Sequence, residues 1–495
     1  MRIGVMTLTV IFLAGVTSCG DEEGEGAKFN LQVNNGSGSG EYPAGQVVTV
    51  SANPQPYGKE FGGWTGDAAL LDDATQMIAK LTMPARDVVL MASFNDIVLE
   101  DVLITLDKTV TYQTIDGFGF FGAYDVWWGD AGNMWNDAWG EKVISDLGIT
   151  IWRNEYFPPA TPNAGQDADW AKQKPVVEGL KAKADEYGVD LKFIFTVWSP
   201  PEDLKWQSSF SWPGDENATR TEGLQTTKNG GTLNPNKYDE FADWLKAGVQ
   251  LYKDSGIDLY ALSLQNELMF TQTFNSCTYT FEWYNDLLKE VVPQIKADYP
   301  EVQIFGSENM LDMEGADDNW PHFYHSNLKT DPQASDNVDI LAVHGYNDGV
   351  APTSGSGLAE RWTNHREQFS DAMDKEAWMT ETSGYTDEWL GNGTSPGALS
   401  LAQDIHAGLY YGNMSAWVWW QGSQLDGIGE FNLMNGTTGG KKYYASKHFY
   451  RYIRPGAMRI KAESSDSENI FLTAYRHETN DTHTIVIINS GAADK

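Results

Sequence analysis

Short apolar runs alternate with helical patterns from about residue 115 to residue 450 of this 495-residue chain. Such a run has the length of a strand that is buried on both faces. Amphipathic patterns lie between the runs, for example at residues 175–187 and 238–255. This alternation predicts a parallel sheet, and its length favours a closed (β/α)8 TIM barrel over residues 115–450. The predicted strands include residues 150–153, 191–198, 259–264, 302–305, 340–344, 376–380 and 416–420.

Two of these runs stop at a glutamate. Residues 259–267 read Leu-Tyr-Ala-Leu-Ser-Leu-Gln-Asn-Glu, and residues 376–381 read Glu-Ala-Trp-Met-Thr-Glu. The carboxyl ends of the strands are where such barrels carry their chemistry. A pair of carboxyl groups is what glycoside hydrolysis needs. We therefore predict that Glu267 and Glu381 form the catalytic pair of a glycosidase.

The charge and composition exclude some functions. The chain has 69 acidic and 34 basic residues, for a formal net charge of −35. This argues against nucleic acid as a partner, which needs a basic surface. Aromatic residues make up 13% of the chain, and their flat rings could line a sugar-binding groove or fill the core. The sequence shows no nucleotide-binding loop and no histidines at metal-ligand spacing, so we expect no cofactor and no metal.

The N-terminus predicts a signal peptide over residues 1–18. Arg2 precedes an apolar run at residues 3–16 that is too short to span a membrane. The run ends Val-Thr-Ser-Cys, which resembles a bacterial lipobox, so we expect Cys19 to be lipidated. The alternative is plain cleavage with an unmodified cysteine. Lipidation would leave Cys277 as the remaining cysteine, so no internal disulfide could form.

Residues 19–27 are predicted to be an acidic tether. They resemble the acidic export signal of bacterial surface lipoproteins. Together with Cys19, this implies a lipid anchor in the outer membrane that faces the cell surface, with the periplasmic side as the alternative. We expect a monomer.

The sequence pattern of residues 28–96 predicts a small β-rich module. Apolar residues alternate with polar ones, and Gly-rich and Asn-Pro segments punctuate the strands. Segments 45–50, 61–66 and 83–88 resemble the divergent internalin-type B-repeat of bacterial surface proteins. Such modules are usually spacers, with sugar binding through Trp64 as an alternative.

The catalytic region resembles glycoside hydrolase family 30 of clan A, most closely its bacterial glucuronoxylanase-like branch. The resemblance runs from about Leu103 to the C-terminus and implies a barrel with a side β-sandwich built from both ends of the region. Residues 97–114 would supply a linker and the first strand or strands, and residues 451–495 the rest. Because these strands are too few for a complete sandwich, we expect it to be truncated at the C-terminus. The motifs that carry the resemblance are at residues 115–119, 197–201, 259–267, 342–346, 378–381, 415–420, 454–460 and 472–475.

The resemblance implies a role for each catalytic carboxylate. Glu267 matches the general acid/base, which protonates the leaving oxygen and later deprotonates water. Glu381 matches the nucleophile of a retaining mechanism, for which the two carboxyl groups lie about 5–5.5 Å apart. A structural ion pair is the alternative for each.

Other residues match supporting positions of the family. Asn266 would bond the 2-hydroxyl of the sugar, and Arg153 would keep Glu381 ionised or form a purely structural ion pair. His344 and Tyr346 would bond the nucleophile and the substrate, although a lone strand-end histidine can be structural. Trp198, Trp419 and Trp127 would wall the sugar subsites or fill the core. Glu155 also lies near a strand end, where it could contact substrate or pair with a cation elsewhere, and the sequence leaves its role open.

The chain departs from the resemblance after the eighth strand. In the glucuronoxylanase-like branch, an arginine in the segment after the eighth strand binds the glucuronate side chain of xylan. Residues 421–427 instead read Gln-Gly-Ser-Gln-Leu-Asp-Gly, with Asp426 and no arginine. A carboxylate substituent would lose its bidentate partner, so we expect cleavage without strict glucuronate dependence.

These observations predict a retaining endo-β-glycanase that acts on a plant cell-wall polysaccharide, most closely β-1,4-xylan. A β-1,6-galactanase or β-1,6-glucanase of the same family is the alternative among enzymes. A non-catalytic surface glycan-binding protein would have no need of both Glu267 and Glu381. A structural adhesin would leave both strand-end carboxylates unexplained.

Overall fold

A computed structural model describes residues 27–56, 58–96, 101–122, 135–158, 167–224, 228–311, 324–346, 357–479 and 481–491. Cys19, the signal peptide and Trp127 lie outside these ranges. The chain divides into two compact units at about residue 101, each of which is described by itself. Among the described helices, none is both long and apolar enough to cross a membrane.

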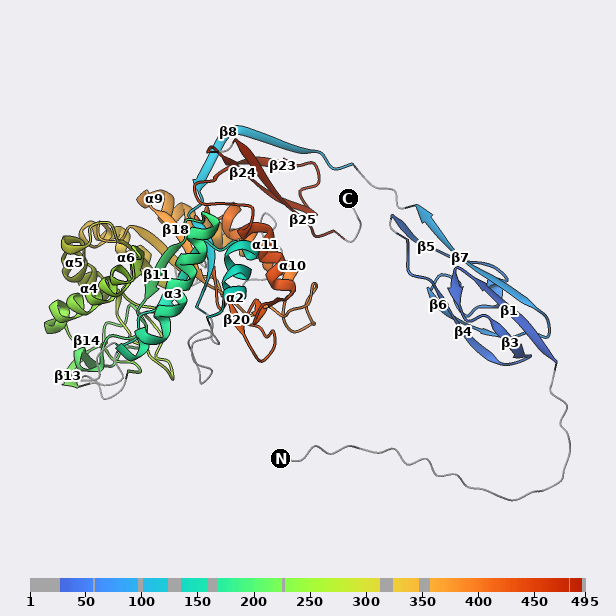
Figure 1. Cartoon of the computed structure of the whole chain (residues 1–495), viewed down its shortest axis with the longest axis horizontal. Helices are drawn as coiled ribbons and strands as arrows, with labels where there is room; N and C mark the ends of the chain where they lie inside the picture. Colours follow the sequence, from blue (N-terminus) through green and yellow to red (C-terminus); the bar gives the residue numbers. More distant parts are fainter. Residues whose placement is uncertain are drawn as a thin grey trace, which may run out of the picture. The chain divides into compact units, whose positions relative to one another are not determined.

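The first unit is a small two-sheet β module (Figure 1). Its sheets have the strand orders β3-β1-β7-β5 and β2-β4-β6. Successive side chains of a strand point to opposite faces, and this decides which of them form the core of the module. In β4, Val48 and Val50 are buried, whereas Val47 is exposed. Trp64 is 4% exposed and its indole nitrogen donates to the Gln76 carbonyl oxygen, so sugar binding through Trp64 is wrong. The strands are β1 (Lys28–Asn34), β2 (Gly36–Ser37), β3 (Gly40–Pro43), β4 (Val47–Ala52), β5 (Lys59–Gly66), β6 (Ile78–Thr82) and β7 (Val88–Asp96).

The second unit contains a closed parallel barrel of eight strands, which confirms the predicted (β/α)8 fold. The strand order around the barrel follows the chain, because the last strand β19 pairs with the first strand β9. The barrel strands are β9 (Gly117–Phe121), β10 (Ile151–Glu155), β11 (Lys192–Thr196), β15 (Leu259–Ser263), β16 (Gln303–Met310), β17 (Ile340–His344), β18 (Glu376–Glu381) and β19 (Ala416–Trp419).

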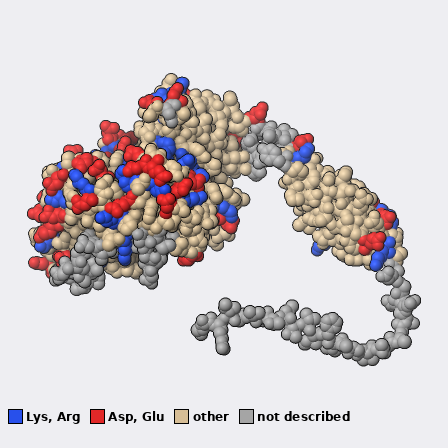
Figure 2. Space-filling view, in the orientation of Figure 1, with Lys and Arg blue, Asp and Glu red and all other residues tan. Residues whose placement is uncertain are grey.

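Amphipathic helices surround the barrel (Figure 1). In α5, the Thr280 side chain caps the N-terminus by accepting from the Trp283 amide, and Leu287, Leu288 and Val291 lie on the buried face. The described α-helices are α2 (Asp137–Glu141), α3 (Asp167–Tyr187), α4 (Tyr238–Asp254), α5 (Phe281–Asp298), α6 (Tyr324–Thr330), α7 (Pro332–Ser335), α8 (Gly357–His365), α9 (Asp371–Met373), α10 (Ala398–Tyr410) and α11 (Lys441–Tyr450). On the face shown in Figure 2, acidic side chains gather over this unit, interspersed with basic ones, as expected for a solvated surface.

Alternate residues of the barrel strands point into the barrel and form a separate interior core. Val418 of β19 belongs to this core, whereas Trp417 and Trp419 pack in the layer between barrel and helices. Ile151 of β10 also points inward, so the same alternation aims Arg153 into the barrel mouth. The pleat of each strand therefore selects which residues can reach a site at the mouth.

A four-stranded antiparallel sheet lies beside the barrel, in the order β25-β24-β23-β8. Its strands come from both ends of the unit, and Phe471 and Tyr475 on one face belong to the main core. The described part of the chain contributes one sheet to the expected side sandwich. Its strands are β8 (Ile104–Thr114), β23 (Met458–Ser464), β24 (Ile470–His477) and β25 (Thr482–Asn489).

Two small three-stranded sheets lie in the loops that follow β11 and β19. They consist of β12 (Lys205–Ser208), β13 (Arg220–Leu224) and β14 (Thr232–Leu233), and of β20 (Ser423–Gln424), β21 (Met434–Asn435) and β22 (Thr438–Gly439). These loops leave the carboxyl ends of their strands, where the candidate site lies.

Candidate active site

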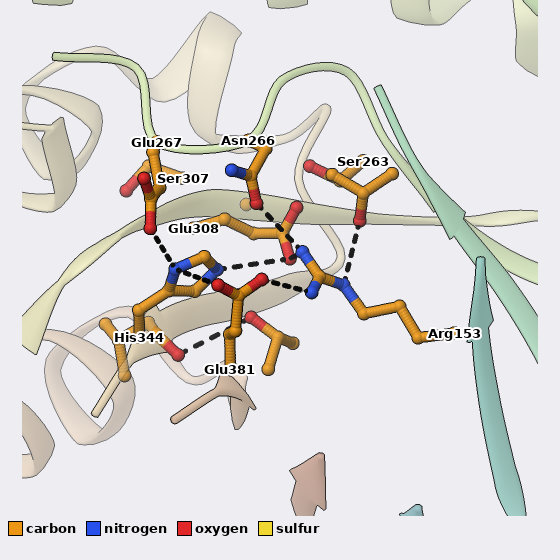
Figure 3. A network of polar contacts seen from close by, with 12 residues as sticks. Arg153, Ser263, Asn266, Glu267, Ser307, Glu308, His344 and Glu381 are labelled. Atoms are coloured by element: carbon orange, nitrogen blue, oxygen red, sulfur yellow. Dashed lines mark hydrogen bonds and ion pairs between the residues drawn. The ribbon is translucent and has the colours of Figure 1, made fainter. Parts of the chain in front are cut away.

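Arg153 is the centre of a buried polar cluster at the mouth of the barrel (Figure 3). Its Nη1 donates to Glu381 Oε2 at 2.6 Å, and its Nη2 donates to Glu308 Oε1 and to Asn266 Oδ1, both at 2.9 Å. Its Nε donates to Thr196 Oγ1 at 3.2 Å. The arginine side chain is fully buried, so these bonds replace its hydration.

The charges of the cluster keep one another ionised. Burial alone would lower the pKa of Arg153, but Glu308 and Glu381 raise it above its usual value. Burial would raise the pKa of Glu308, but the Arg153 guanidinium and His344 hold it below its usual value. Because each charge is the main compensation for the other, neither can be removed without leaving a buried charge unpaired.

Glu381, the last residue of β18, is held at both carboxylate oxygens. Arg153 donates to Oε2, and the Tyr346 hydroxyl donates to Oε1 at 2.6 Å. The residue is 5% exposed. This arrangement fixes the direction of the Glu381 side chain.

Glu267 follows β15 at a backbone φ of +47°, in the left-handed region that few non-glycine residues adopt. His344 Nδ1 lies 3.0 Å from Glu267 Oε1, and Gln272 Nε2 donates to Glu267 Oε2 at 3.2 Å. In the part of the chain that the structure describes, Arg153 forms ion pairs with Glu381 and Glu308 but none with Glu267, which pairs with His344 instead. It is also the most exposed of the three, at 9%, which suits it to exchange a proton with a bound molecule.

His344, the last residue of β17, lies between the carboxylates. Burial alone would lower its pKa, but Glu381, Glu267 and Glu308 raise the pKa of His344 to about 9. The imidazole is therefore protonated at neutral pH, and Nδ1 donates to Glu267. The cluster then holds two cationic groups, Arg153 and His344, and three carboxyl groups.

The two predicted catalytic carboxylates approach each other closely. One oxygen of Glu267, one oxygen of Glu381 and a ring nitrogen of His344 all lie within 4.8 Å of one another. Three such atoms could in principle ligate a metal ion. Arg153 donates directly to Glu381 and protonated His344 donates to Glu267, so each carboxyl group already has a cationic neighbour, which disfavours a metal ion at the same place.

Trp198 and Trp420 form an aromatic wall beside the cluster. The ring of Trp198 lies 4.9 Å from the Arg153 guanidinium, and its centroid lies 6.0 Å from that of Trp420. Trp420 also stacks on Phe121 at 4.4 Å. A cavity of about 410 Å³ opens against this wall, lined by Glu155, Phe157, Trp198, Phe274, Asn275 and Trp420.

The structure corrects the prediction for Trp419. Its side chain is fully buried and its indole nitrogen donates to the Phe431 carbonyl oxygen, so it cannot wall a subsite. The pleat of β19 explains this: Ala416 and Val418 point into the barrel, and Trp420 is the next residue with their orientation. Period-two counting along the sequence could have identified Trp420.

The structure brings most of the predicted residues together. Hydrogen bonds and ion pairs join these residues in one network: Glu267, Glu381, Asn266, Arg153, His344 and Tyr346. Trp198 lies against this network. Trp127 lies outside the described residues. The prediction missed Glu308, which lies three residues beyond the strand predicted at residues 302–305; the observed β16 continues to Met310. It also missed Gln272, which lies in an irregular loop with no sequence signal.

We expect replacement of Arg153 by methionine to lower the free energy of unfolding by about 3–5 kcal/mol, because Glu308 and Glu381 would lose their buried cation. Urea denaturation checks this. Lys174→Met is the matched control, since its pair with Glu178 is half exposed and 3.7 Å apart, and its loss costs at most about 1 kcal/mol. Similar losses in the two variants would contradict the prediction.

The pKa of His344 predicts a pH-dependent stability. Because the folded pKa of about 9 exceeds the unfolded value near 6.5, the stabilisation is complete below about pH 6.5 and is lost as pH rises through about 9. The loss is at most about 3 kcal/mol. Denaturation at pH 6 and pH 9.5 should show a smaller pH difference for His344→Gln than for the unmodified chain. The exposed His448 supplies a control, His448→Gln, and an equal pH difference in all three proteins would refute the assignment.

Comparison with known proteins gives two kinds of match. Residues 29–98 match the family model described as "Divergent InlB B-repeat domain". The rest of the chain is similar to the glucuronoxylanase XynC of Bacillus subtilis (strain 168), with 26% identity over 382 residues that cover 75% of each chain. The chain therefore has glycoside hydrolases among its relatives.

Solved structures share the fold of the second unit. The family 30 subfamily 8 xylanase Xyn30A from Clostridium acetobutylicum superposes with a TM-score of 0.58 at 24% identity, over 79% of this chain and 84% of that chain. The endo-β-1,6-glucanase BT3312 superposes with a TM-score of 0.61 at 21% identity, over 78% and 86%. Both likenesses support the (β/α)8 barrel with additional β structure.

Proposed function

We propose that this protein is a retaining endo-β-glycanase that hydrolyses a plant cell-wall polysaccharide, with β-1,4-xylan as the leading substrate. The proximity of Glu267 to Glu381 carries the proposal, because both belong to a cluster with atoms within 4.8 Å. This spacing fits the separation of about 5–5.5 Å used by retaining enzymes better than the wider gap that admits a water molecule. The similarity to a glucuronoxylanase supports the glycanase assignment.

In the proposed reaction Glu381 attacks the anomeric carbon while Glu267 protonates the leaving oxygen. The Glu381–sugar bond forms as the glycosidic bond breaks, and water activated by Glu267 then releases the sugar. Arg153 and Tyr346 orient Glu381 for the attack. Asn266, fixed at its oxygen by Arg153, turns its amide nitrogen away from the guanidinium (Figure 3) and is placed to bond the sugar's 2-hydroxyl.

We assign His344 a supporting role in the proton transfers of Glu267. It donates to Glu267 and lies 3.9 Å from Glu381 Oε1. When Glu267 gives its proton to the leaving group, a protonated His344 stabilises the new carboxylate.

The segment at residues 421–427 supports cleavage without strict glucuronate dependence, since it contains Asp426 and no arginine. Because this segment lacks the arginine, β-1,6-galactan and β-1,6-glucan stay as alternative substrates. The similarity in fold to an endo-β-1,6-glucanase is consistent with these alternatives. A surface protein that only binds glycans is less well supported, because binding alone needs no paired and oriented carboxylates.

The test is product analysis on glucuronoxylan, arabinoxylan, undecorated xylan, β-1,6-galactan and β-1,6-glucan. We expect oligosaccharides from xylan, including the undecorated polymer, whose first-formed reducing ends are β by NMR. Glu381→Ala should lower kcat by about a thousandfold or more. Glu376→Ala is the matched control, because Glu376 begins the strand that Glu381 ends, and it should keep its activity.

Other outcomes discriminate between the alternatives. Products from a β-1,6 polymer alone would refute xylan as the substrate and leave the proposed mechanism in place. A strict requirement for glucuronate would overturn the independence from decoration. Binding without any hydrolysis would favour the glycan-binding function, and α reducing ends would refute retention.

We further propose that Cys19 carries a lipid that anchors the protein to the outer membrane, with the catalytic unit facing the outside of the cell. The lipobox-like segment and the acidic residues 21–25 support this. Labelled palmitate should enter the unmodified protein expressed in a bacterial host and not Cys19→Ala. Equal labelling of Cys19→Ala, or no label in the unmodified protein, would refute the anchor. Cys277→Ala is the control, since Cys277 is buried.

A further inference from the structure

The two carboxyl oxygens of Glu267 have different partners. His344 Nδ1 lies 3.0 Å from Oε1 (Figure 3), and Gln272 Nε2 donates to Oε2 at 3.2 Å. The carboxylates around His344 keep its imidazole protonated at neutral pH, so this ring can only donate at the contact. A hydrogen donated to Oε1 takes the place that a carboxyl proton would need there. The proton that Glu267 exchanges is therefore assigned to Oε2, the oxygen that Gln272 bonds.

A buried serine fixes the backbone of Gln272. Ser276 Oγ accepts from the backbone amides of Gln272 and Gly230 at 3.0 and 2.9 Å, and it donates to the Phe274 carbonyl oxygen at 3.3 Å. Both acceptor positions and the single proton of this hydroxyl group are thus used. The Ser276 carbonyl oxygen also accepts from Lys205 Nζ at 2.8 Å. The side chain of Gln272 therefore extends towards Glu267 from an anchored backbone.

A glutamine side chain can bond both protonation states of a carboxyl group. Its amide carries a donor NH2 group and an acceptor oxygen. The NH2 group bonds a carboxylate, and a half turn about the last side-chain torsion presents the oxygen to a carboxylic acid instead. Protonated His344 lacks this choice, because both of its ring nitrogens are donors. The partial exposure of Gln272 permits the turn.

A retaining mechanism needs both states of Glu267 in succession. In the first step the O–H bond at Oε2 breaks, the proton joins the leaving oxygen, and the electron pair stays on the carboxylate. In the second step water returns a proton to Oε2 while its oxygen replaces Glu381 at the anomeric carbon. A partner that only donates would favour the carboxylate throughout and oppose the first step. A partner that can also accept serves both steps.

We propose that Gln272 is a positioning residue that holds Oε2 of Glu267 in both protonation states by turning its side-chain amide. This inference rests on the proposed function and deepens it, because it concerns the proton transfers of the same site. Gln272 acts through Glu267 and not on the sugar itself. The competing explanation is structural, with Gln272 serving only to close the loop after β15.

The experiment compares leaving groups of different acidity. Departure of a weakly acidic phenol needs a proton from the general acid, whereas departure of a strongly acidic phenol does not. The probes are the phenyl and 2,4-dinitrophenyl β-glycosides of xylotriose and of gentiotriose, which represent xylan and the β-1,6-glucan alternative. kcat/KM is measured for the unmodified full chain and for Gln272→Met, Gln272→Lys and Thr273→Met. Thr273 is an exposed residue of the same loop and supplies the matched control.

We expect Gln272→Met to lower kcat/KM about tenfold for the phenyl glycoside and less than about twofold for the 2,4-dinitrophenyl glycoside. Gln272→Lys keeps a donor and loses the acceptor, so it should lower the phenyl value at least as far. Thr273→Met should leave both values unchanged. All variants should unfold at the same urea concentration as the unmodified chain, and Gln272→Ser serves if Gln272→Met does not fold.

Several results would overturn the proposal. Equal losses for the two leaving groups, with unfolding at lower urea, would leave Gln272 a structural role. Unchanged kcat/KM in Gln272→Met would remove its role altogether, and full activity of Gln272→Lys would mean that a donor suffices. No hydrolysis of any probe by the unmodified chain would reject the glycanase and this role together. Hydrolysis that depends on Glu381 and not on Gln272 would reject this role alone.

Discussion

The ion pairs of Arg153 with Glu308 and Glu381 are the interaction on which the site depends. All three side chains lie at or near zero exposure inside the barrel mouth. A charge in that position is tolerated only because the opposite charges and the hydrogen bonds replace water. The guanidinium joins β10, β16 and β18 and also bonds Asn266, so one side chain orients both Glu381 and the residue that precedes Glu267. The geometry of the site thus follows from satisfying one buried cation.

The barrel makes this arrangement possible because parallel strands deliver their carboxyl ends to the same mouth. Glu381 and His344 are the last residues of adjacent strands, and Glu267 follows a third. The pleat then decides which neighbours take part. Trp420 reaches the mouth because it continues the inward series of Ala416 and Val418, while Trp419 turns towards the helices. A shift of one residue therefore separates a core residue from a residue of the aromatic wall.

The loops after β11 and β15 are joined to each other by one buried side chain. The buried Lys205 donates to Ser199 Oγ and to the carbonyl oxygens of Lys228 and Ser276. These bonds tie the loop after β11 to the loop after β15, which carries Gln272, Phe274 and Asn275. Gln272, which donates to Glu267, and two residues of the cavity thus share one anchored loop. This connection links the position of Glu267 to the shape of the neighbouring cavity.

The sequence by itself determined the barrel, because alternating buried strands and amphipathic helices leave few other folds. It also identified Glu267, Glu381, Arg153 and His344 as strand-end residues, since strand ends are readable from apolar runs. It could not identify Glu308 as the second partner of Arg153 or Gln272 as a partner of Glu267, and it left the role of Glu155 open. Those contacts join segments that lie far apart in the chain, for example Arg153 with Glu308, and only the closed barrel brings them together. Only the tertiary structure decided burial as well, and burial is what turns these ordinary charged residues into a tightly coupled cluster.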